Sequence, residues 1–347
     1  MKNNKDLRNI CGQLLIIGFD GTEIISNHPI QEAIVKHNLG GVILFDKNLK
    51  KPDQGKNIQS PEQVKRLTTD LQALTPFPLF IAVDYEGGRV NRLKPEYGFP
   101  ETITPKAFAA LPEKEAKIEA QKMAQTLKKS GFNLNFSPLI DVAIYAENPI
   151  IAQLDRSFSA DPNVVAQYAL IVAQALRNEK ITFCYKHFPG HGSSRGDSHI
   201  GIVDVSDTWQ HEELIPYERL LKDPLGCDMI MSAHIINRQL DPTGLPASLS
   251  YAHLTTLLRQ KYQYQGLIIA DDLQMNAITD AFGLEESIIM ALNAGNDLLI
   301  VGNQCGNKDY STEEIVELIV KNVSDGKIAL HRIQESFERI QHAKEKY

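Results

Sequence analysis

The chain alternates between short apolar runs and longer stretches in which apolar residues recur at helical spacing. Eight of the runs are nearly continuous in apolar and often β-branched residues, and they lie at 13–17, 41–45, 79–84, 133–137, 182–187, 229–234, 267–271 and 297–301. Continuous apolar runs of this length are typical of parallel strands that are buried on both faces. The pattern therefore predicts eight parallel strands separated by helices.

Residues that begin and end helices stand between the predicted strands. Ser60-Pro61 and Asp161-Pro162 each place a capping side chain before a proline at the first helical position, and Gln63 completes a capping box after Ser60. Gly131 ends a helical stretch just before a strand. Near the C-terminus, apolar residues at helical spacing over 333–340 predict a helix that packs one face onto the body.

Eight strand–helix repeats fit either a closed (β/α)8 barrel or an open, doubly wound sheet. The number eight favours the barrel, and so does the lack of a Gly-x-Gly-x-x-Gly motif after the first run. We therefore expect an α/β fold, a single-domain (β/α)8 TIM-type barrel over residues 1–347. The barrel itself is expected at about 12–302, followed by C-terminal helices at 311–347.

Polar residues gather at the carboxyl ends of several predicted strands. Asp84, Lys186, His187, His234 and Asp271 all lie at such ends. Barrel enzymes carry their catalytic residues at this rim, because the loops that follow the strands meet there. The convergence predicts an active site at the carboxyl end of the barrel.

Composition and charge exclude several classes of protein. The chain is 43% apolar and 23% charged, which is the balance of a globular protein and excludes a disordered one. Lys+Arg 36 against Asp+Glu 43 gives a net charge of −7, so no basic field is present to bind nucleic acid or anionic lipid. We expect neither nucleic acid nor a membrane as a partner, and the composition leaves the oligomeric state open.

Cysteine spacing and apolar run length indicate the compartment. The cysteines lie far apart without a Cys-x-x-Cys pair, which argues against a disulfide scaffold or a zinc ribbon; they are Cys11, Cys184, Cys227 and Cys305. No run approaches the ~18 apolar residues of a membrane-spanning helix, and the stretch 14–17 is shorter than the apolar core of a signal peptide, which is about 7–15 residues. We expect a cytoplasmic protein.

The segment 185–199 is rich in glycine and histidine and follows the fifth predicted strand. Asp197 and His199 are spaced so that the carboxylate can orient the imidazole and raise its pKa, which suits a general acid near neutral pH. A solvated loop is the simpler interpretation of a lone histidine, but several histidines here favour a site. His187, His191, Asp197 and His199 are also metal-ligand types, yet no early His-x-His pair follows a strand, and we expect neither metal nor cofactor.

Two further segments carry candidate chemistry. Asp271 and Asp272 end the seventh predicted strand, and because strand side chains alternate, we expect only one of them, Asp271, to face the barrel mouth, with Asp272 as a helix N-cap. A carboxylate at this rim can attack an electrophilic carbon. The segment 84–92 places an acidic residue, two glycines and two arginines after the third strand, which alone is a weak signal. Arg156 by itself is typical of a surface position.

Taken together, these segments resemble the family 3 glycoside hydrolases, and more narrowly the β-N-acetylglucosaminidases of bacterial peptidoglycan recycling (the NagZ type). The likeness runs in chain order from about 12 to 301 and rests on the motifs at 84–92, 155–158, 186–192 with 197–199, and 271–275. The Lys-His-Phe-Pro-Gly-His-Gly block followed by Asp-Ser-His is highly specific. Ser193-Ser194 departs from the Asp-Thr that is frequent after this block.

The resemblance implies roles for individual residues. It implies that Asp271 is the nucleophile, that His199 is the general acid/base, and that Asp197 orients His199. The sugar-binding positions that it implies are Asp84, Arg92, Arg156, Lys186 and His187.

The resemblance also implies the reaction. We expect a retaining exo-β-N-acetylglucosaminidase that releases terminal N-acetylglucosamine from peptidoglycan-derived muropeptides or related glycosides through a covalent glycosyl-aspartate. Alternatives stay open: attack by the substrate's own acetamido oxygen, phosphate in place of water as acceptor, another β-glycosidase specificity within the family, or a glycan sensor without turnover. The partner in each case is a small glycan.

Overall fold

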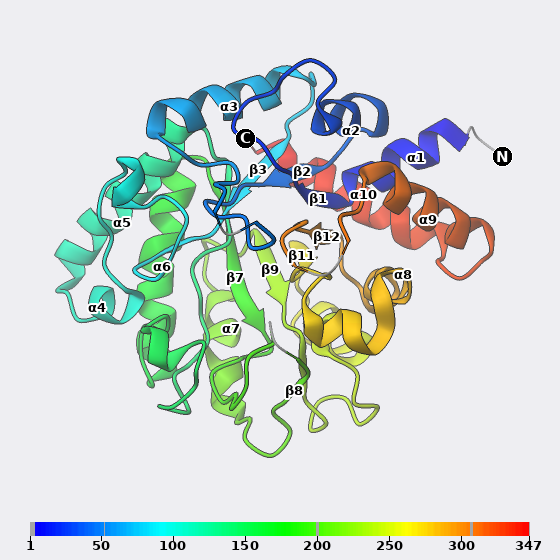
Figure 1. The fold of residues 1–347 in the computed structure, drawn as a ribbon. Coiled ribbons are helices and arrows are strands. Elements are labelled where there is room, and N and C mark those ends of the chain that lie inside the picture. The colour runs from blue at the N-terminus through cyan, green and yellow to red at the C-terminus, as the bar shows by residue number, and fades with distance from the viewer. Residues whose placement is uncertain (1–3, 52, 199–200, 306–307, 347) are drawn as a thin grey trace.

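Eight parallel strands close into a barrel in the computed structural model of the chain, which describes residues 4–51, 53–198, 201–305 and 308–346 (Figure 1). The barrel strands are β1 (Leu15–Gly18), β2 (Gly41–Ile43), β3 (Phe80–Val83), β6 (Leu134–Asn135), β7 (Thr182–Phe188), β9 (Met229–Ser232), β11 (Leu267–Ala270) and β12 (Leu298–Val301). β1 pairs with both β12 and β2, with Ile16 opposite Ile300 and Gly41, and this double pairing closes the barrel. The predicted (β/α)8 barrel and its eight strands are confirmed, with ends that shift by a residue or two.

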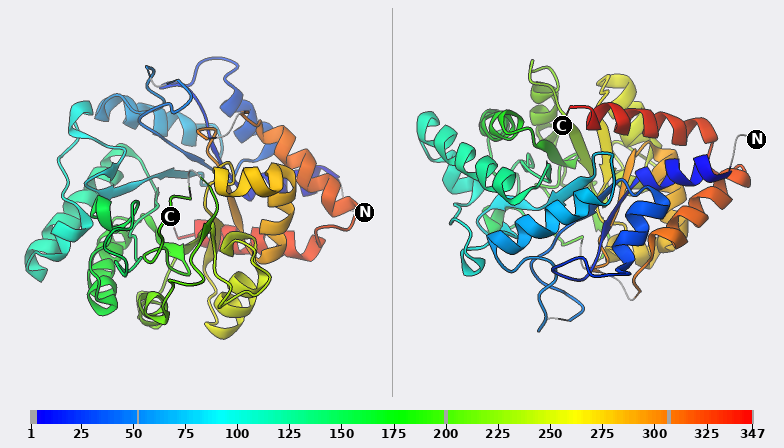
Figure 2. Two further views of the ribbon diagram at one scale, coloured as in Figure 1. Left: turned by 60° about the horizontal axis from the view of Figure 1, so that its bottom comes forward. Right: turned by 90° about the horizontal axis from the view of Figure 1, so that it is seen from above.

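Helices surround the strands on all sides (Figures 1 and 2). They are α1 (Asn4–Gln13), α2 (Pro29–His37), α3 (Pro61–Ala73), α4 (Pro105–Ala109), α5 (Glu113–Ser130), α6 (Pro162–Asn178), α7 (Ile215–Leu220), α8 (Asn276–Ala294), α9 (Thr312–Ser324) and α10 (Leu330–Lys344), with a π-helical segment η5 (Ala252–Lys261) before β11. α1 packs beside α9 and α10, so the two ends of the described chain cover the same side of the barrel (Figure 1).

Short elements lie in the loops that follow the barrel strands. β4 (Tyr85–Gly87) and β5 (Val90–Asn91) form an antiparallel pair, and β8 (Val203–Asp204) pairs in parallel with β10 (Ile235–Ile236). The 3-10 turns are η1 (Pro95–Tyr97), η2 (Ala152–Leu154), η3 (His211–Leu214) and η4 (Ala247–Leu249). These insertions build up the walls of the barrel mouth around the strand ends.

The helix ends predicted at Ser60, Asp161 and Gly131 are confirmed. The Ser60 hydroxyl accepts from the Gln63 amide and Asp161 accepts from the Asn163 amide, while Gly131 takes a left-handed conformation (φ 85°) after α5. Gln63 differs in detail, because its side-chain oxygen accepts from the amide of Gln59 rather than from the cap residue. In α10 the stripe of apolar residues over 333–340 faces the body, as expected.

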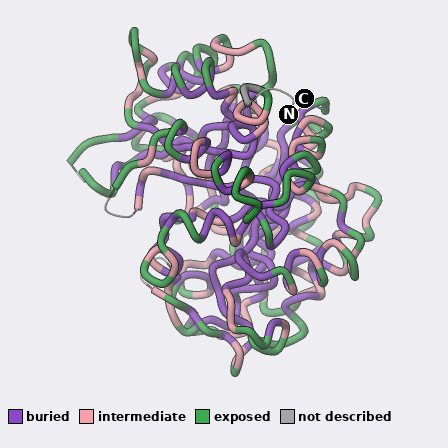
Figure 3. Tube along the Cα trace, turned by 90° about the vertical axis from the view of Figure 1, so that its right-hand side faces the viewer, coloured by how far each residue is buried: buried purple, intermediate pink, exposed green. Residues whose placement is uncertain are grey.

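The buried residues are concentrated in the interior of the fold, and the exposed residues lie on its periphery (Figure 3). Every residue of the eight barrel strands is buried, so each strand presents one face to the barrel interior and the other to the helices. Within the described ranges, none of the helices combines the length and the apolarity that crossing a bilayer requires.

A buried lysine lies at the amino-terminal end of the barrel. The Lys344 ammonium at the end of α10 donates to Gln13 Oε1 (2.9 Å) and to the Gly40 carbonyl (2.8 Å), beside the starts of β1 and β2. Its nitrogen lies 5.0 Å from the centre of the Phe80 ring. Burial lowers the pKa of Lys344 to about 7.

We expect the stability contributed by this site to rise with pH. Because the folded pKa of Lys344 is about 7 and an unfolded lysine has a pKa of about 10.4, the unfolded chain binds more protons between these values. Below pH 7, Lys344 is protonated in both the folded and the unfolded state, so the free-energy cost of burying its charge is fully present. Above pH 7 the folded state releases this proton, and the free energy of unfolding rises by up to about 1.4 kcal/mol per pH unit. Urea unfolding at pH 7, 8 and 9 should show this rise in the parent and its loss in Lys344→Met.

The exposed Lys346, two residues further on, provides the matched control. Lys346→Met should follow the parent at every pH. Identical pH dependence in the parent and Lys344→Met would contradict the prediction.

Candidate active site

A pocket of about 220 Å³ lies at the carboxyl end of the barrel. Apolar side chains from or next to four strands form its floor; they are Ile43, Phe136, Met231 and Ile300. Six of the predicted site residues line it, namely Asp84, Arg92, Arg156, Lys186, His187 and Asp271. The structure therefore brings together, in one cavity, side chains that lie nearly 190 positions apart in the sequence.

Buried charges surround the Lys186 side of this pocket. The Lys186 ammonium lies 3.0 Å from Asp84 Oδ1 and 2.7 Å from Glu86 Oε1. Burial opposes charge on these groups, but Lys186 and Arg92 hold the pKa of Asp84 below its ordinary value, and the two carboxylates hold the pKa of Lys186 above its own. Asp84 and Lys186 are therefore both ionised at neutral pH.

Arg156 is buried rather than on the surface, which corrects the expectation for a lone arginine. Its guanidinium binds Glu86 through two parallel hydrogen bonds of 2.9 and 2.8 Å and donates to the Ile150 carbonyl. Burial would raise the pKa of Glu86, but Arg156 and Lys186 outweigh it and bring that pKa far below its ordinary value. Sequence reasoning gave Glu86 no role, although it stands within the 84–92 motif.

His187 is held by a second residue that sequence reasoning missed. Its Nδ1 lies 2.7 Å from Asp141 Oδ2, and Asp141 is fully buried on the loop after β6. His187 in turn lines the pocket. The apolar surroundings of Asp141 in the sequence, Pro138-Leu139-Ile140-Asp141-Val142, were the available signal, because a carboxylate within a buried run needs a partner.

Asp271 follows β11 directly and lines the pocket. Its Oδ1 accepts from the amide of Asp272 (2.8 Å). Asp272 also lines the pocket, which corrects the expectation that only one of the pair would do so; β11 ends at Ala270, and strand alternation no longer applies beyond it.

Asp272 is not a helix N-cap. α8 begins at Asn276 with Met275 at the cap position, and a turn separates it from β11. Asp272 Oδ1 instead accepts from the amides of Gln274 (3.0 Å) and Gly302 (3.2 Å). One oxygen of this carboxylate is thus engaged in joining the loop after β11 to the end of β12.

His234, at the rim as predicted, lies behind the pocket. Its Nε2 lies 3.0 Å from the Asp272 carbonyl and its Nδ1 2.7 Å from the Ser248 hydroxyl. Because a carbonyl only accepts, Nε2 carries the proton and Nδ1 accepts from Ser248. His234 supports the Asp271-Asp272 turn rather than lining the cavity.

The loop after β7 is fixed at its base. The amide of His191 donates to Asp141 Oδ1 (2.8 Å), Asn148 donates to the His191 carbonyl (2.8 Å), and the amide of Gly192 donates to Glu213 Oε2 (2.7 Å). A Cβ at Gly192 would lie 1.6 Å from the Val142 carbonyl oxygen, so only glycine fits. Burial raises the pKa of Glu213 to about 8, so this carboxyl is largely neutral at pH 7.

The predicted acid/base pair lies further along this loop. His199 falls outside the described residues, and its role stays a prediction. Asp197 is described and half-buried. The carbonyl of the next residue, Ser198, accepts from the amide of Ala277 at the start of α8 (3.4 Å), shortly after Met275, which lines the pocket. Ser198 therefore lies beside the Asp271 side of the barrel mouth.

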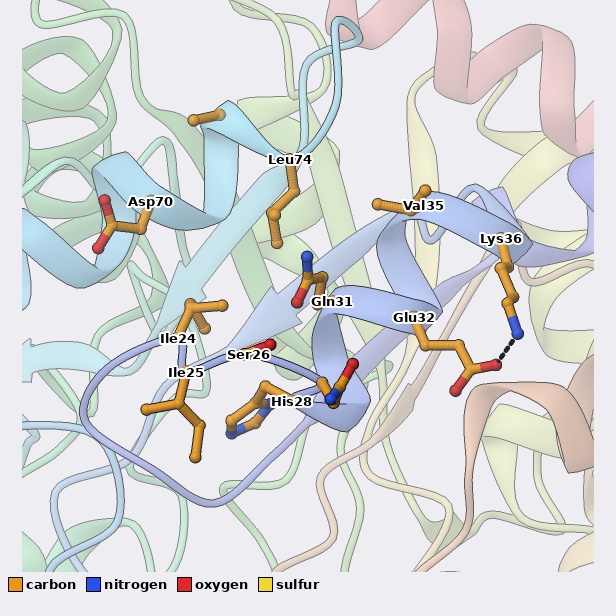
Figure 4. A pocket seen from close by; sticks show the side chains of 12 residues that line it. Ile24, Ile25, Ser26, His28, Gln31, Glu32, Val35, Lys36, Asp70 and Leu74 are labelled. Carbon is orange, nitrogen blue, oxygen red and sulfur yellow. Dashed lines mark hydrogen bonds and ion pairs between the residues drawn. The ribbon is translucent and has the colours of Figure 1, made fainter.

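Two other kinds of feature, a metal-binding cluster and a second pocket, were considered as alternative functional sites. Among the described residues, no three or more His, Cys, Asp or Glu side chains are grouped so that they could hold a metal ion. A larger pocket of about 740 Å³ lies between α2, α3 and the loop before α2, where Lys36 pairs with Glu32 (Figure 4). Aliphatic and polar side chains line it together, and none of the predicted site residues is among them. The smaller pocket at the strand ends is the candidate active site.

The chain is similar in sequence and in structure to known glycoside hydrolases. The family described as "Glycosyl hydrolase family 3 N terminal domain" matches residues 6–343. Beta-hexosaminidase A of Pseudoalteromonas piscicida is 32% identical over 98% of this chain, and the chain covers 59% of that protein. The beta-hexosaminidase of Hydrogenovibrio crunogenus is 33% identical over 79% of this chain and 74% of its own length. A solved glycoside hydrolase family 3 beta-N-acetylglucosaminidase from Paenibacillus sp. superposes with a TM-score of 0.87 at 29% identity, over 98% of this chain and 62% of its own.

Proposed function

The chain belongs to glycoside hydrolase family 3, and from this premise we propose that it is a retaining exo-β-N-acetylglucosaminidase. Its proposed reaction releases a terminal N-acetylglucosamine unit from peptidoglycan-derived muropeptides or related glycosides. The observation that carries the proposal is that Asp271 lines the same small pocket as Asp84, Arg92, Arg156, Lys186 and His187.

In the proposed mechanism, Asp271 attacks the anomeric carbon while His199 donates a proton to the departing glycosidic oxygen. The C1–O bond to the leaving group breaks and a C1–O bond to Asp271 forms. Water then gives its proton to the neutral His199 and its hydroxyl to C1, which frees Asp271 and the sugar. Asp197 would orient His199 for both proton transfers.

The remaining pocket residues would bind and orient the sugar. Lys186 and the two arginines offer fixed hydrogen-bond donors to ring hydroxyls and to the acetamido carbonyl, and Asp84 offers an acceptor. Asp84 and Glu86 neutralise most of this positive charge, so the pocket suits a neutral polar sugar. Its volume of about 220 Å³ is below the ~300–1,000 Å³ of typical ligand pockets, which supports binding of one terminal unit.

A muropeptide would place an anionic leaving group at the mouth. Lys47, Arg92 and Lys94 also line the pocket and would offset the net negative charge of the chain locally. Wall recycling implies a cytoplasmic reaction, and the four cysteines are free, as a reducing compartment requires.

The alternatives predict different products or rate dependences. In attack by the acetamido oxygen, a second carboxylate orients the acetamido group; one oxygen of Asp272 already accepts from the amides of Gln274 and Gly302, which disfavours this role. Fluorine on the acetamido group would slow that route steeply, because it weakens the attacking oxygen. For attack by Asp271 we expect the rate to depend only weakly on the number of fluorine atoms. In phosphate buffer the expected product is free N-acetylglucosamine; the sugar 1-phosphate would identify a phosphorylase. Normal sugar binding without turnover of any aryl glycoside would identify a sensor.

Replacing His199 with alanine is expected to slow the hydrolysis of substrates with poor leaving groups by about 10²–10⁴-fold. The loss on nitrophenyl N-acetyl-β-glucosaminide should be much smaller, because nitrophenolate departs without a proton. Both values of kcat/KM test the acid role. His211, an exposed histidine on η3, is the matched control, and His211→Ala should change neither. Equal losses on both substrates in His199→Ala would rule out the acid role.

A further inference from the structure

Asp141 lies at the junction of two parts of the candidate site. Its Oδ2 lies 2.7 Å from Nδ1 of His187, and its Oδ1 accepts from the backbone amides of His187 (3.1 Å) and His191 (2.8 Å). Asp141 is fully buried, and the side chain of His187 is only 9% exposed. One carboxylate therefore holds both a pocket-lining ring and the backbone at the base of the loop after β7.

The partners of this carboxylate determine its charge. Burial alone would disfavour ionisation, but His187 and the two amides outweigh it and hold the pKa of Asp141 below its ordinary value. An ionised carboxylate has no proton to donate. The hydrogen between Asp141 and His187 therefore belongs to Nδ1 of the ring.

This proton assignment fixes what the ring offers to a ligand. When the His187 ring is neutral, a proton on Nδ1 leaves Nε2 with a lone pair, because a neutral imidazole carries only one ring proton. The other basic side chains that line the pocket can only donate; they are Lys47, Arg92, Lys94, Arg156 and Lys186. His187 is thus the basic residue of the pocket that can accept a hydrogen bond.

We propose that Asp141 is a positioning residue that fixes His187 in its Nδ1-protonated form, so that Nε2 accepts a hydrogen bond from a hydroxyl or amide N–H of the bound sugar. The proposal rests on the proposed function only in taking the ligand to be a sugar. It adds a determinant of binding in the loop after β6, outside every motif that the sequence singled out.

The variant Asp141→Asn tests this directly. The amides of His187 and His191 both need an oxygen at the Oδ1 position, so the new NH2 group takes the Oδ2 position and faces His187. It would donate to Nδ1 and move the ring proton to Nε2, which would turn the acceptor in the pocket into a donor. The loop contacts of Oδ1 would stay in place, so the change is confined to the ring.

The first readout is the protonation state of the ring, which requires no turnover. In ¹⁵N-histidine-labelled protein at pH 8, with the His187 signals assigned by their loss in His187→Gln, the parent should show a bare Nε2 and Asp141→Asn a protonated one. A neutral ring protonated at Nε2 in the parent would overturn the proposal without any variant.

The second readout is affinity for N-acetylglucosamine. We expect Asp141→Asn to weaken binding by about tenfold to a hundredfold and to raise KM far more than it lowers kcat, since the lost hydrogen bond leaves an unmatched pair of donors. Asp161→Asn, a conservative change at the cap of α6, should bind like the parent. Unchanged affinity together with an exchanged ring proton would also overturn the proposal. If the parent binds the sugar through His187 but hydrolyses no N-acetylglucosaminide, the proposed function fails while this inference stands.

Discussion

Replacing Asp271 with alanine is expected to lower kcat/KM for aryl N-acetyl-β-glucosaminides by about 10⁴-fold or more, which corresponds to at least about 5 kcal/mol of lost transition-state stabilisation. The reason is geometric: Asp271 follows β11 directly and lines the pocket, with its Oδ1 fixed by the amide of Asp272. Without it, the proposed two-step route through a glycosyl-aspartate would be lost. Steady-state kinetics on the purified variant measure the effect.

Asp272 provides the neighbouring control. Asp272→Asn keeps an oxygen that accepts from the amides of Gln274 and Gly302, so its loss should be far smaller than that of Asp271→Ala. A 2-fluoro sugar substrate should label Asp271 in the parent, as peptide mass mapping would reveal. Label on Asp272, or on neither residue, would remove the nucleophile assignment.

Replacing Glu86 with leucine is expected to lower the free energy of unfolding by about 3–5 kcal/mol, because it leaves the Arg156 guanidinium buried without its carboxylate. The double variant Glu86→Leu with Arg156→Met should recover most of this loss, since a buried ion pair replaced by apolar groups is often close to neutral in stability. Lys186 would keep its contact with Asp84 in both variants. Urea or thermal unfolding measures both changes.

Comparing these two variants distinguishes an effect on stability from an effect on sugar binding. The double variant should remain poorly active although it is stable, because Arg156 lines the pocket and its donors would be absent. Lys106→Ala, which removes an exposed ion pair with Asp155, should cost less than about 1 kcal/mol. A double variant as unstable as Glu86→Leu alone would show that the pair is not the source of the loss.

The strand ends were the part of the candidate site whose position in the fold could be predicted best. Asp84, Lys186, His187 and Asp271 each sit at or just beyond a buried apolar run, and closure of the barrel brings all such ends to one rim. The prediction that a helix begins after Asp272 was wrong, because the chain makes a turn between β11 and α8. Turns of this kind depend on the amides that surround them, here that of Gly302, and these come from another strand.

The amino-acid sequence by itself determined the order of strands and helices and the polar residues that end the strands, because hydrophobic periodicity and strand termination are local properties of the chain. Only the tertiary structure decided which charges are paired. Glu86 meets Arg156 across 70 positions and Asp141 meets His187 across 46, and neither separation leaves a pattern in the sequence. Burial then makes these contacts obligatory, since a carboxylate removed from water is tolerated only with a partner.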